Sequence, residues 1–320
     1  MVGTATPGDW VRSARYSAAP EVSADLRAAL AELVGDDIEW LAELPASEEI
    51  QADRRRVHIG ARLPSGWPPS AFAWFHSTNA GVDGLLGGRS WPSATLLTRT
   101  TGRMGRRIAE YLLSWMLVET QQSLAFTAQG QRRDWRRQPV RLLENDLAVV
   151  FGVGRIGGAV GQLLRSCGLR VLGVSRRGEL VPGFDEVVDL AGALRRLGAA
   201  QWVISTLPLT DQTRGLFDQR LFDACDHACF MNVGRGATVD YSGIRAALAS
   251  GRLRRAVLDV LPVEPPGAED PWWSLPNTTI TPHIAGVTAD DDVLADFRRC
   301  REALLAGKRP GLAADPDAGY

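Results

Sequence analysis

In the middle of the chain, short apolar runs alternate with longer amphipathic stretches. The apolar runs predict strands at Asp146–Phe151, Leu169–Val174, Trp202–Thr206, Ala228–Val233, Arg255–Val260 and Thr278–Thr281. Helix-like segments occupy the first four intervals, at Ile156–Cys167, Leu190–Leu197, Gln212–Cys225 and Ser242–Ser250, and a proline-rich loop, Pro262–Pro276, occupies the last. Strand, helix and strand repeating every 23 to 33 residues is typical of parallel βαβ units. We therefore expect an α/β fold with a Rossmann-type, doubly wound parallel sheet.

The stretch before residue 98 has the pattern of a second, smaller α/β unit. Its predicted elements are an amphipathic helix over Glu21–Leu33 and short strands at Arg56–Gly60 and Phe72–His76. Beyond Gly286, the sequence predicts another amphipathic helix over Asp290–Leu305, which can return to this first unit.

Two further segments are predicted to form a buried or intersubunit helix and an exposed connection. Arg107–Gln122 carries apolar residues on most faces of a helix, which predicts burial between elements or at a subunit interface. We expect a homodimer formed through this helix. The Arg/Gln-rich stretch Gln129–Arg141 is expected to be an exposed connection between the domains.

Composition narrows the classes of function. With 36 basic and 37 acidic side chains, the net charge of −1 gives no electrostatic reason to expect a nucleic acid or an anionic membrane as partner. The four cysteines fit a reducing cytoplasm, and we find no signal peptide and no apolar run of the roughly 18–20 residues that span a bilayer. Lys308 is the sole lysine and lies near the C-terminus before Pro310, which argues against Schiff-base enzymes and phosphate-loop NTPases.

A glycine fingerprint follows the first predicted strand of the Rossmann region. Gly152–Gly157 (GVGRIG) lies directly between a hydrophobic strand and an amphipathic helix. In this setting Gly152 permits the turn, Gly154 lets a pyrophosphate approach, and Gly157 lets helix and strand pack closely. A glycine-rich turn without a ligand is the alternative, but the flanking elements favour a dinucleotide site. We expect Arg155 and Ile156, at the start of the helix, to contact the cofactor as well.

The end of the next strand bears on the choice of dinucleotide. Where an acidic residue would hold the ribose 2′-hydroxyl of NAD, this chain has Ser175, Arg176 and Arg177. A hydroxyl and two guanidinium groups suit a 2′-phosphate, so the sequence favours NADP(H), with NAD(H) possible. The alternative is that both arginines are solvated turn residues.

Three further polar residues follow later strands. Arg235, Glu264 and His283 come after the predicted strands Ala228–Val233, Arg255–Val260 and Thr278–Thr281. The carboxyl ends of parallel strands meet at the edge of the sheet where such folds bind ligands, so we expect the three side chains to converge there. An arginine binds a planar carboxylate, and a histidine beside a carboxylate transfers protons near neutral pH.

At this point the chain resembles the D-isomer-specific 2-hydroxyacid dehydrogenase family over most of its length. The matching segments are Asn79–Asp83, Ala109–Tyr111, Gly152–Gly157, Leu207–Thr210, Asn232–Gly236, Ala256–Glu264 and Thr281–Gly286. The resemblance implies that Arg235 binds the substrate carboxylate, that His283 is the acid/base and that Glu264 supports it. It also implies that Asn79, Ala80 and Gly81 hold the carboxylate from the other domain, and that Leu207, Pro208, Thr213 and Asp259 contact the cofactor, with Asp259 beside the nicotinamide carboxamide.

The same resemblance implies a domain layout and an activity. We expect a flavodoxin-like substrate domain, residues 1–97 and 287–320, with a dinucleotide-binding Rossmann domain, residues 98–286, inserted in it. The expected activity is that of a cytoplasmic NAD(P)-dependent oxidoreductase acting on small 2-oxo or D-2-hydroxy acids. Ser175–Arg177 and the C-terminal Asp317–Tyr320 look most like NADPH-preferring glyoxylate/hydroxypyruvate reductases. The formate dehydrogenases of the family are disfavoured, because they are expected to carry glutamine where this chain has Glu264.

Some features fit less well or admit other interpretations. The family's usual threonine-asparagine pair is replaced by Thr98–Thr101 (TRTT), which we take to affect only a connection. Cys225–Cys229 (CDHAC) offers three donors that cannot readily converge, so we expect no metal site. Trp272 and Trp273 are either a hydrophobic lid or a wall of the substrate pocket. A non-catalytic dinucleotide-binding regulatory protein on the same fold is the alternative function.

Overall fold

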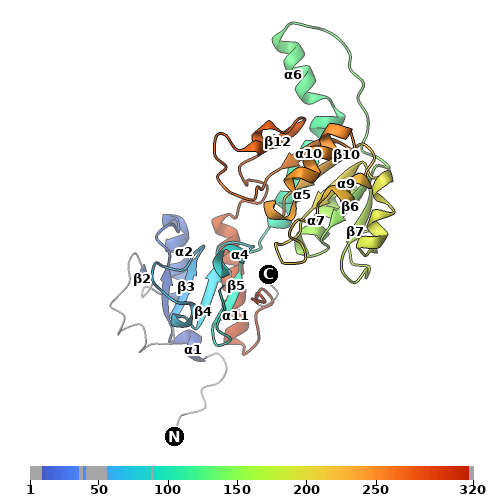
Figure 1. The fold of residues 1–320 in the computed structure, drawn as a ribbon. Coiled ribbons are helices and arrows are strands. Elements are labelled where there is room, and N and C mark those ends of the chain that lie inside the picture. The colour runs from blue at the N-terminus through green and yellow to red at the C-terminus, as the bar shows by residue number, and fades with distance from the viewer. Residues whose placement is uncertain (1–8, 36–38, 41–55, 88, 317–320) are drawn as a thin grey trace. The chain divides into compact units, whose positions relative to one another are not determined.

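The structure is a computed structural model that describes residues 9–35, 39–40, 56–87 and 89–316. The segment Asp317–Tyr320, used above for the subfamily resemblance, lies outside the described residues. The chain divides into two compact units. Unit 1 comprises residues 1–103 with 288–320, and unit 2 comprises residues 104–287. Each unit is built around its own parallel sheet (Figure 1).

Unit 1 contains a five-stranded sheet in the order β2-β1-β3-β4-β5, in which all neighbours pair in parallel. Its strands are β1 Arg15–Ala18, β2 Glu39–Trp40, β3 Arg56–Gly60, β4 Trp74–Ser77 and β5 Leu96–Arg99. The sequence predicted β3 and most of β4 but missed β1, because RYSA has little apolar character of its own. Neighbouring strands supply its burial, and the Ser17 hydroxyl donates to the carbonyl of Val57 at 3.1 Å.

Helices α2 (Ala24–Val34) and α11 (Asp290–Leu305) pack together in unit 1, which also contains the short helices α1 (Asp9–Arg12) and α4 (Asp83–Leu86). The predicted bounds of α11 are confirmed. Helix α2 starts later than predicted, because Ser23 caps it by accepting a hydrogen bond from the amide of Leu26 at 3.1 Å. Phe297 of α11 stacks on Trp74 with ring centroids 4.8 Å apart, which ties the helix to the sheet.

Helix α11 also holds the last residues of the first segment of unit 1. The buried carboxylate of Asp296 accepts from the amides of Thr101 and Gly102 at 2.7 Å, and Asp292 accepts from the amide of Arg103 at 3.1 Å. The altered Thr98–Thr101 segment is therefore held at its end by Asp296, which follows Thr101 by 195 positions.

Unit 2 contains a seven-stranded parallel sheet in the order β12-β11-β10-β9-β6-β7-β8. Its strands are β6 Leu147–Phe151, β7 Arg170–Val174, β8 Glu186–Val188, β9 Trp202–Ser205, β10 Ala228–Asn232, β11 Leu253–Leu258 and β12 Thr278–Ile280. Its helices are α5 Met104–Thr120, α6 Ser123–Gln131, α7 Arg155–Ser166, α8 Leu190–Leu194, α9 Gln219–Asp223 and α10 Tyr241–Ser250. The predicted α/β fold with a doubly wound parallel sheet is confirmed. Only β8 was not foreseen among its strands.

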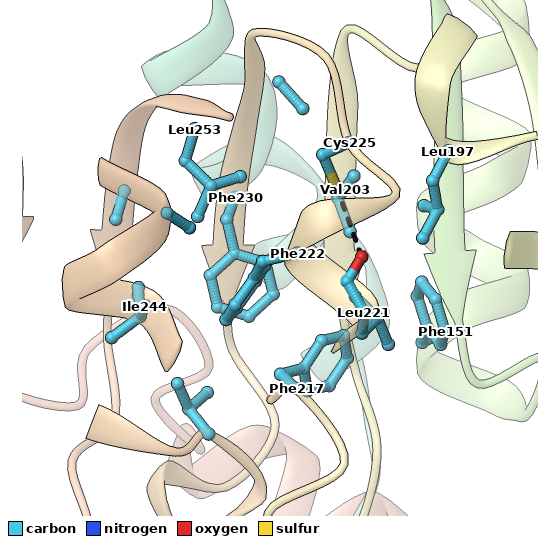
Figure 2. Close-up of a cluster of buried hydrophobic side chains, with 14 of the residues drawn as sticks. Phe151, Leu197, Val203, Phe217, Leu221, Phe222, Cys225, Phe230, Ile244 and Leu253 are labelled. Atoms are coloured by element: carbon cyan, nitrogen blue, oxygen red, sulfur yellow. Dashed lines mark hydrogen bonds between the residues drawn. The ribbon is translucent and has the colours of Figure 1, made fainter. Parts of the chain in front are cut away.

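Both faces of this sheet are covered by apolar cores. On one face Phe217 contacts Phe151 and Phe230 with ring centroids 5.0 and 4.9 Å apart, and Phe222 lies 5.2 Å from Phe230 (Figure 2). On the other face the sheet packs against α5 and α7. Alternate residues of β6 enter opposite cores, as the two-residue period of a strand requires.

Two predictions about unit 2 were wrong in part. The predicted helix Gln212–Cys225 is helical only over Gln219–Asp223. Gly215 has φ +62°, in the left-handed region, and Asp218 caps the helix by accepting from the amide of Leu221 at 2.9 Å. The segment Gln129–Arg141 does not connect the two units, because it lies wholly within unit 2 and begins in α6. It is exposed along most of its length, as expected.

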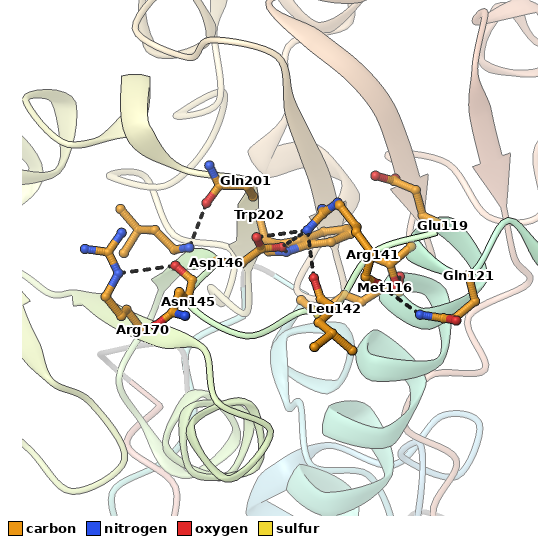
Figure 3. Close-up of polar contacts among 12 residues, drawn as sticks. Met116, Glu119, Gln121, Arg141, Leu142, Asn145, Asp146, Arg170, Gln201 and Trp202 are labelled. Atoms are coloured by element: carbon orange, nitrogen blue, oxygen red, sulfur yellow. Dashed lines mark hydrogen bonds and ion pairs between the residues drawn. The ribbon is translucent and has the colours of Figure 1, made fainter. Parts of the chain in front are cut away.

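Helix α6 packs on α5 and projects from the sheet of unit 2 (Figure 1). The chain returns at Arg141, whose amide donates to the carbonyl of Thr120 at 3.1 Å. Arg141 also pairs with Asp146 at 2.7 Å, and Asp146 accepts from the indole of Trp202 at 2.8 Å (Figure 3). These contacts close the base of the projection at the amino-terminal edge of the sheet. Among the described residues, no helix is long and apolar enough to cross a membrane.

Candidate active site

The glycine loop between β6 and α7 has the shape that the fingerprint requires. Gly152 has φ +100°, and a β-carbon on Gly157 would lie 1.8 Å from the carbonyl oxygen of Gly152. A β-carbon on Gly154 would meet no atom within 4 Å, so the backbone is open on that side. No side chain caps α7 at Gly154, which leaves its first amides available to an anion. The loop therefore fits the pyrophosphate of a dinucleotide.

Arg155 and Ile156 form the first turn of α7, with Arg155 exposed and Ile156 half-buried. At the end of β7, the Ser175 hydroxyl accepts from the amide of Gly178 at 3.1 Å, so its side chain shapes the turn. Arg176 and Arg177 are exposed. No carboxylate occurs between Ser175 and Gly178.

The loops after β9 and β10 lie against each other. The Thr213 hydroxyl donates to the carbonyl of Pro208 at 2.6 Å and accepts from the amide of Thr210 at 2.8 Å, which fixes the turn that begins at Leu207. A β-carbon on Gly234 would lie 2.5 Å from the carbonyl oxygen of Leu207. Only glycine therefore lets the two loops approach this closely.

Arg235 is held by its own loop. The Asn232 side chain accepts from the amide of Gly234 at 3.0 Å and donates to the carbonyl of Arg235 at 3.1 Å. The guanidinium Nη1 donates to the carbonyl of Gly234 at 2.8 Å. A β-carbon on Gly236 would lie 1.9 Å from the carbonyl carbon of Leu261, so this loop also lies against the loop after β11.

His283 and Glu264 form the pair that the sequence predicted. His283 Nδ1 lies 2.7 Å from Glu264 Oε2, with the two side chains 50% and 35% exposed. Glu264 Oε1 accepts from the amide of Leu261 at 2.8 Å, which orients the carboxylate. The contact with Nδ1 leaves Nε2 of the half-exposed imidazole for a reacting group, as an acid/base requires.

The histidine has a left-handed backbone with φ +54°, which is costly for a side chain with a β-carbon. The loop is anchored by Asp259, which is 2% exposed. Its carbonyl accepts from the amide of His283, and its carboxylate accepts from the amides of Ile284 and Ala285, each at 2.9 Å. The contact of Asp259 with the nicotinamide carboxamide stays a prediction. This anchoring could not be predicted from the sequence, because it depends on how the loop turns its amides toward the carboxylate.

The third group of predicted residues lies in unit 1, after β4. Asn79 is exposed, Ala80 is buried and Gly81 is half-buried. The amide of Asn79 donates to the Ser77 hydroxyl at 3.1 Å, and Arg99 Nη1 lies 3.4 Å from the carbonyl oxygen of Ala80. Arg99 belongs to the segment that we took to be a mere connection, and the structure instead places its guanidinium on the predicted substrate loop.

Cys225 and Cys229 are buried, and burial raises the pKa of the Cys225 thiol to about 12. His227 between them is exposed. Trp272 is buried beneath Tyr241, with ring centroids 5.1 Å apart, whereas Trp273 is 51% exposed. The two tryptophans thus have different environments, one in the core and one at the surface.

The chain matches known proteins along the length that carries this site. Residues 113–285 match the model of the D-isomer-specific 2-hydroxyacid dehydrogenase, NAD-binding domain. A protein of Streptomyces coelicolor described only as an uncharacterized protein in the mprR 3′ region is 47% identical over 266 residues, which is 82% of this chain and 94% of that protein. Glyoxylate/hydroxypyruvate reductase A of Serratia proteamaculans is 32% identical over 251 residues, covering 75% of this chain and 79% of that protein.

A solved structure extends the similarity to the whole fold. It is an NADPH-dependent glyoxylate/hydroxypyruvate reductase from Sinorhizobium meliloti in complex with NADP and sulfate. It is 26% identical, covers 96% of this chain and all of that chain, and superposes with a TM-score of 0.80. The segments that first suggested the resemblance include the glycine loop, the Arg235 loop and both residues of the His283–Glu264 pair. The chain belongs to the D-isomer-specific 2-hydroxyacid dehydrogenase family.

Proposed function

We propose that this protein is an NAD(P)H-dependent reductase of small 2-oxo acids, of the glyoxylate/hydroxypyruvate reductase kind. Membership of the family supports an oxidoreductase acting on CH–OH donors. The observation that carries the proposal is the His283–Glu264 pair, 2.7 Å apart, in a unit whose sheet also bears an intact dinucleotide loop. A regulatory protein that only binds the dinucleotide has no need for that pair.

In the proposed reaction each residue has one task. A bound nicotinamide dinucleotide supplies the hydride that reaches the ketone carbon. His283 donates a proton to the ketone oxygen as negative charge develops there, and Glu264, 2.7 Å from Nδ1, holds the imidazole ring in its orientation. Arg235 binds the substrate carboxylate through its guanidinium.

We further propose that NADP(H) is the preferred cofactor. The absence of a carboxylate from Ser175 to Gly178 and the exposure of Arg176 and Arg177 support this preference. The similar reductase from Sinorhizobium meliloti is NADPH-dependent and was solved with NADP.

We also propose a homodimer formed through α5 and located in the cytoplasm. Leu117 of α5 is 42% exposed, although Ile108, Leu112 and Met116 of the same helix are buried. Further apolar side chains are exposed on α6 and the segment after it, namely Leu124, Phe126, Trp135, Val140 and Leu142. A second copy would cover this surface.

All four cysteines are free, which suits a reducing compartment.

The proposed function is tested by turnover. Glyoxylate, hydroxypyruvate and a series of longer 2-oxo acids are each mixed with the protein and NADPH or NADH, and oxidation of the dinucleotide is followed at 340 nm. We expect reduction of at least one short 2-oxo acid, faster with NADPH. Dinucleotide binding by calorimetry without turnover on any 2-oxo acid would contradict the proposal and favour the regulatory protein.

A further inference from the structure

A chain of hydrogen bonds runs from α5 to the histidine loop within unit 2. The Tyr111 hydroxyl lies 2.6 Å from Thr281 Oγ1, and Thr281 Oγ1 lies 2.5 Å from Asp259 Oδ1. The same Oδ1 accepts from the amide of Ile284, and Oδ2 accepts from the amide of Ala285, both at 2.9 Å. Helix α5 is therefore linked to the residues that directly follow β12 and β11, Thr281 and the buried Asp259.

The direction of each hydrogen bond follows from counting protons. A carboxylate only accepts, so the single hydroxyl proton of Thr281 is donated to Asp259. Thr281 then has none to offer Tyr111, and the phenol must donate to Thr281. Burial raises the pKa of Tyr111 to about 12, so the phenol keeps its proton at neutral pH. The order Tyr111 to Thr281 to Asp259 is therefore the one that satisfies every group.

This series of hydrogen bonds stabilises the backbone of the His283 loop. His283 has a left-handed backbone, and its side chain is half-exposed, so packing does little to hold it. What holds the loop is Asp259, through the amides of Ile284 and Ala285 and through its own carbonyl. The carboxylate keeps its orientation only if its third donor, Thr281, is itself fixed. Tyr111 fixes it, and its ring contacts Trp115 with centroids 6.4 Å apart.

We propose that Tyr111 and Thr281 are positioning residues, which orient Asp259 so that it holds His283 at the place where it transfers its proton. This inference rests on the proposed function, because it takes His283 as the acid/base. Neither residue is assigned a contact with substrate or cofactor. Their effect is expected on the rate of the reacting complex rather than on the affinity for either ligand.

The test removes one hydroxyl at a time. Tyr111→Phe and Thr281→Val should each lower kcat by about 10- to 100-fold, the size of effect that a small misplacement of a reacting group produces. The KM values for the 2-oxo acid and for NADPH should change by less than about threefold. Thr281→Ser keeps the hydroxyl and should restore kcat to within about threefold of the parent. The double variant should be no worse than Thr281→Val, since both residues act through one chain.

Thr279→Val is the matched control. It deletes the same group two residues earlier, within β12, where the Thr279 hydroxyl accepts from Arg255 at 2.9 Å. Among the described residues, that hydroxyl makes no hydrogen bond to Asp259 or to the histidine loop. Thr279→Val should leave kcat unchanged. Hydrogen–deuterium exchange of the amides of Ile284 and Ala285 gives a second readout that needs no turnover. Exchange at both should rise in Tyr111→Phe and Thr281→Val and stay unchanged in Thr279→Val and Thr281→Ser.

The possible failures can be told apart. If the parent turns over a 2-oxo acid and both Tyr111→Phe and Thr281→Val keep kcat within about twofold, the positioning role is wrong while the proposed function stands. Equal losses in Thr279→Val and Thr281→Val would also overturn it, since they would show a general effect on folding. A parent without turnover would overturn the proposed function and the catalytic meaning of the positioning. Amide exchange at Ile284 and Ala285 would then still decide whether the hydrogen bonds of Tyr111 and Thr281 hold the loop.

Discussion

Individual side chains at the carboxyl edge of the unit 2 sheet form a connected set. Glu264 contacts Nδ1 of the His283 imidazole, and the carbonyl of Asp259 accepts from the backbone amide of the same residue. The amide of Leu261 donates to Glu264, and Gly236 of the Arg235 loop lies against Leu261. The pair is thus supported by the same loop that bears the proposed carboxylate anchor.

The first prediction concerns the proposed acid/base. His283→Ala removes the proton donor and should lower kcat by about 10²–10⁴-fold. Arg235→Ala removes a charged hydrogen-bond donor and should lower kcat/KM by roughly 10- to 100-fold, with a raised KM for the 2-oxo acid. Steady-state kinetics with the best 2-oxo acid measure both effects. His227→Ala, which changes an exposed histidine, is the control. Near-normal turnover of His283→Ala would mean that the site lies elsewhere.

The second prediction concerns the residues after β7. Arg176 and Ser175 offer donors to a 2′-phosphate, and one such contact surviving in solvent gives roughly a tenfold preference for NADPH. Ser175→Asp combined with Arg176→Ala places a carboxylate near the ribose and should reverse the preference. Specificity constants for NADPH and NADH report the change, and the pH dependence of kcat should not move. Equal specificity constants for NADPH and NADH in the parent would show that the arginines do not bind the 2′-phosphate.

At the scale of elements, the start of α7 packs so closely against the loop after β6 that there is no space for a β-carbon at Gly157. A β-carbon at Gly157 would strike the carbonyl of Gly152 at 1.8 Å, whereas one at Gly158 would lie 3.7 Å from its nearest neighbour, the carbonyl of Pro182. Gly157→Ala should therefore lower both the unfolding midpoint and the affinity for the dinucleotide. Gly158→Ala, one residue later in the same helix, should preserve affinity and add roughly 0.5–1 kcal/mol of stability. Calorimetry with NADPH and urea unfolding compare the two, and equal behaviour would contradict this account of the loop.

Strands β3 and β4 of unit 1 carry two buried histidines that predict a pH dependence of stability. Burial lowers the pKa of His58 to about 4 and that of His76 to about 3, from 6.5. Below pH 6.5 the unfolded chain takes up protons at both sites and the folded chain does not. The contribution of the two histidines to the free energy of unfolding is therefore fully present above pH 6.5 and is lost as the pH falls toward 4. From pH 7 to pH 5 the loss is about 2 kcal/mol for each histidine.

Urea unfolding of the full chain at pH 7 and pH 5 measures this loss. His58→Phe should remove part of it, because a phenyl ring fits between Phe72 and Phe75, where the imidazole now packs at 5.3 and 5.2 Å. His227→Asn, at an exposed position with φ +59° that asparagine tolerates, should leave the pH dependence as it is. If His58→Phe lost as much free energy of unfolding between pH 7 and pH 5 as the parent, the imidazole of His58 would not contribute to the pH dependence.

At the scale of the whole molecule, the prediction is that two copies associate through α5. Leu117→Glu places a charge on the exposed part of that helix and should shift the protein from dimer to monomer in sedimentation velocity at micromolar concentration. Leu190→Glu at the start of α8, which is 40% exposed, is the control and should leave the mass unchanged. A parent that sediments as a monomer would remove the dimer from the proposal.

Much of the molecule could be predicted from the sequence, where the signal is local. The parallel βαβ pattern, the glycine loop and α11 all depend on periodicity and on residues next to one another in the chain. The rule that the carboxyl ends of parallel strands share one edge gathered Arg235, Glu264 and His283 into one unit. The contact between His283 and Glu264 confirms that placement for those two residues.

Tertiary structure decided what depends on partners distant in sequence. Strand β1 has little apolar character and exists because β2 and β3 pair with it. The first part of the predicted helix Gln212–Cys225 forms a turn instead, because the Thr213 hydroxyl bonds to the Thr210 amide and the Pro208 carbonyl and Gly215 has a left-handed backbone. Asp259 has both carboxylate oxygens occupied by donors more than 20 residues away, at Thr281, Ile284 and Ala285. Sequence periodicity reports which face of an element is buried, but a hydrogen bond needs two groups placed within about 3 Å, and only the folded chain fixes that distance.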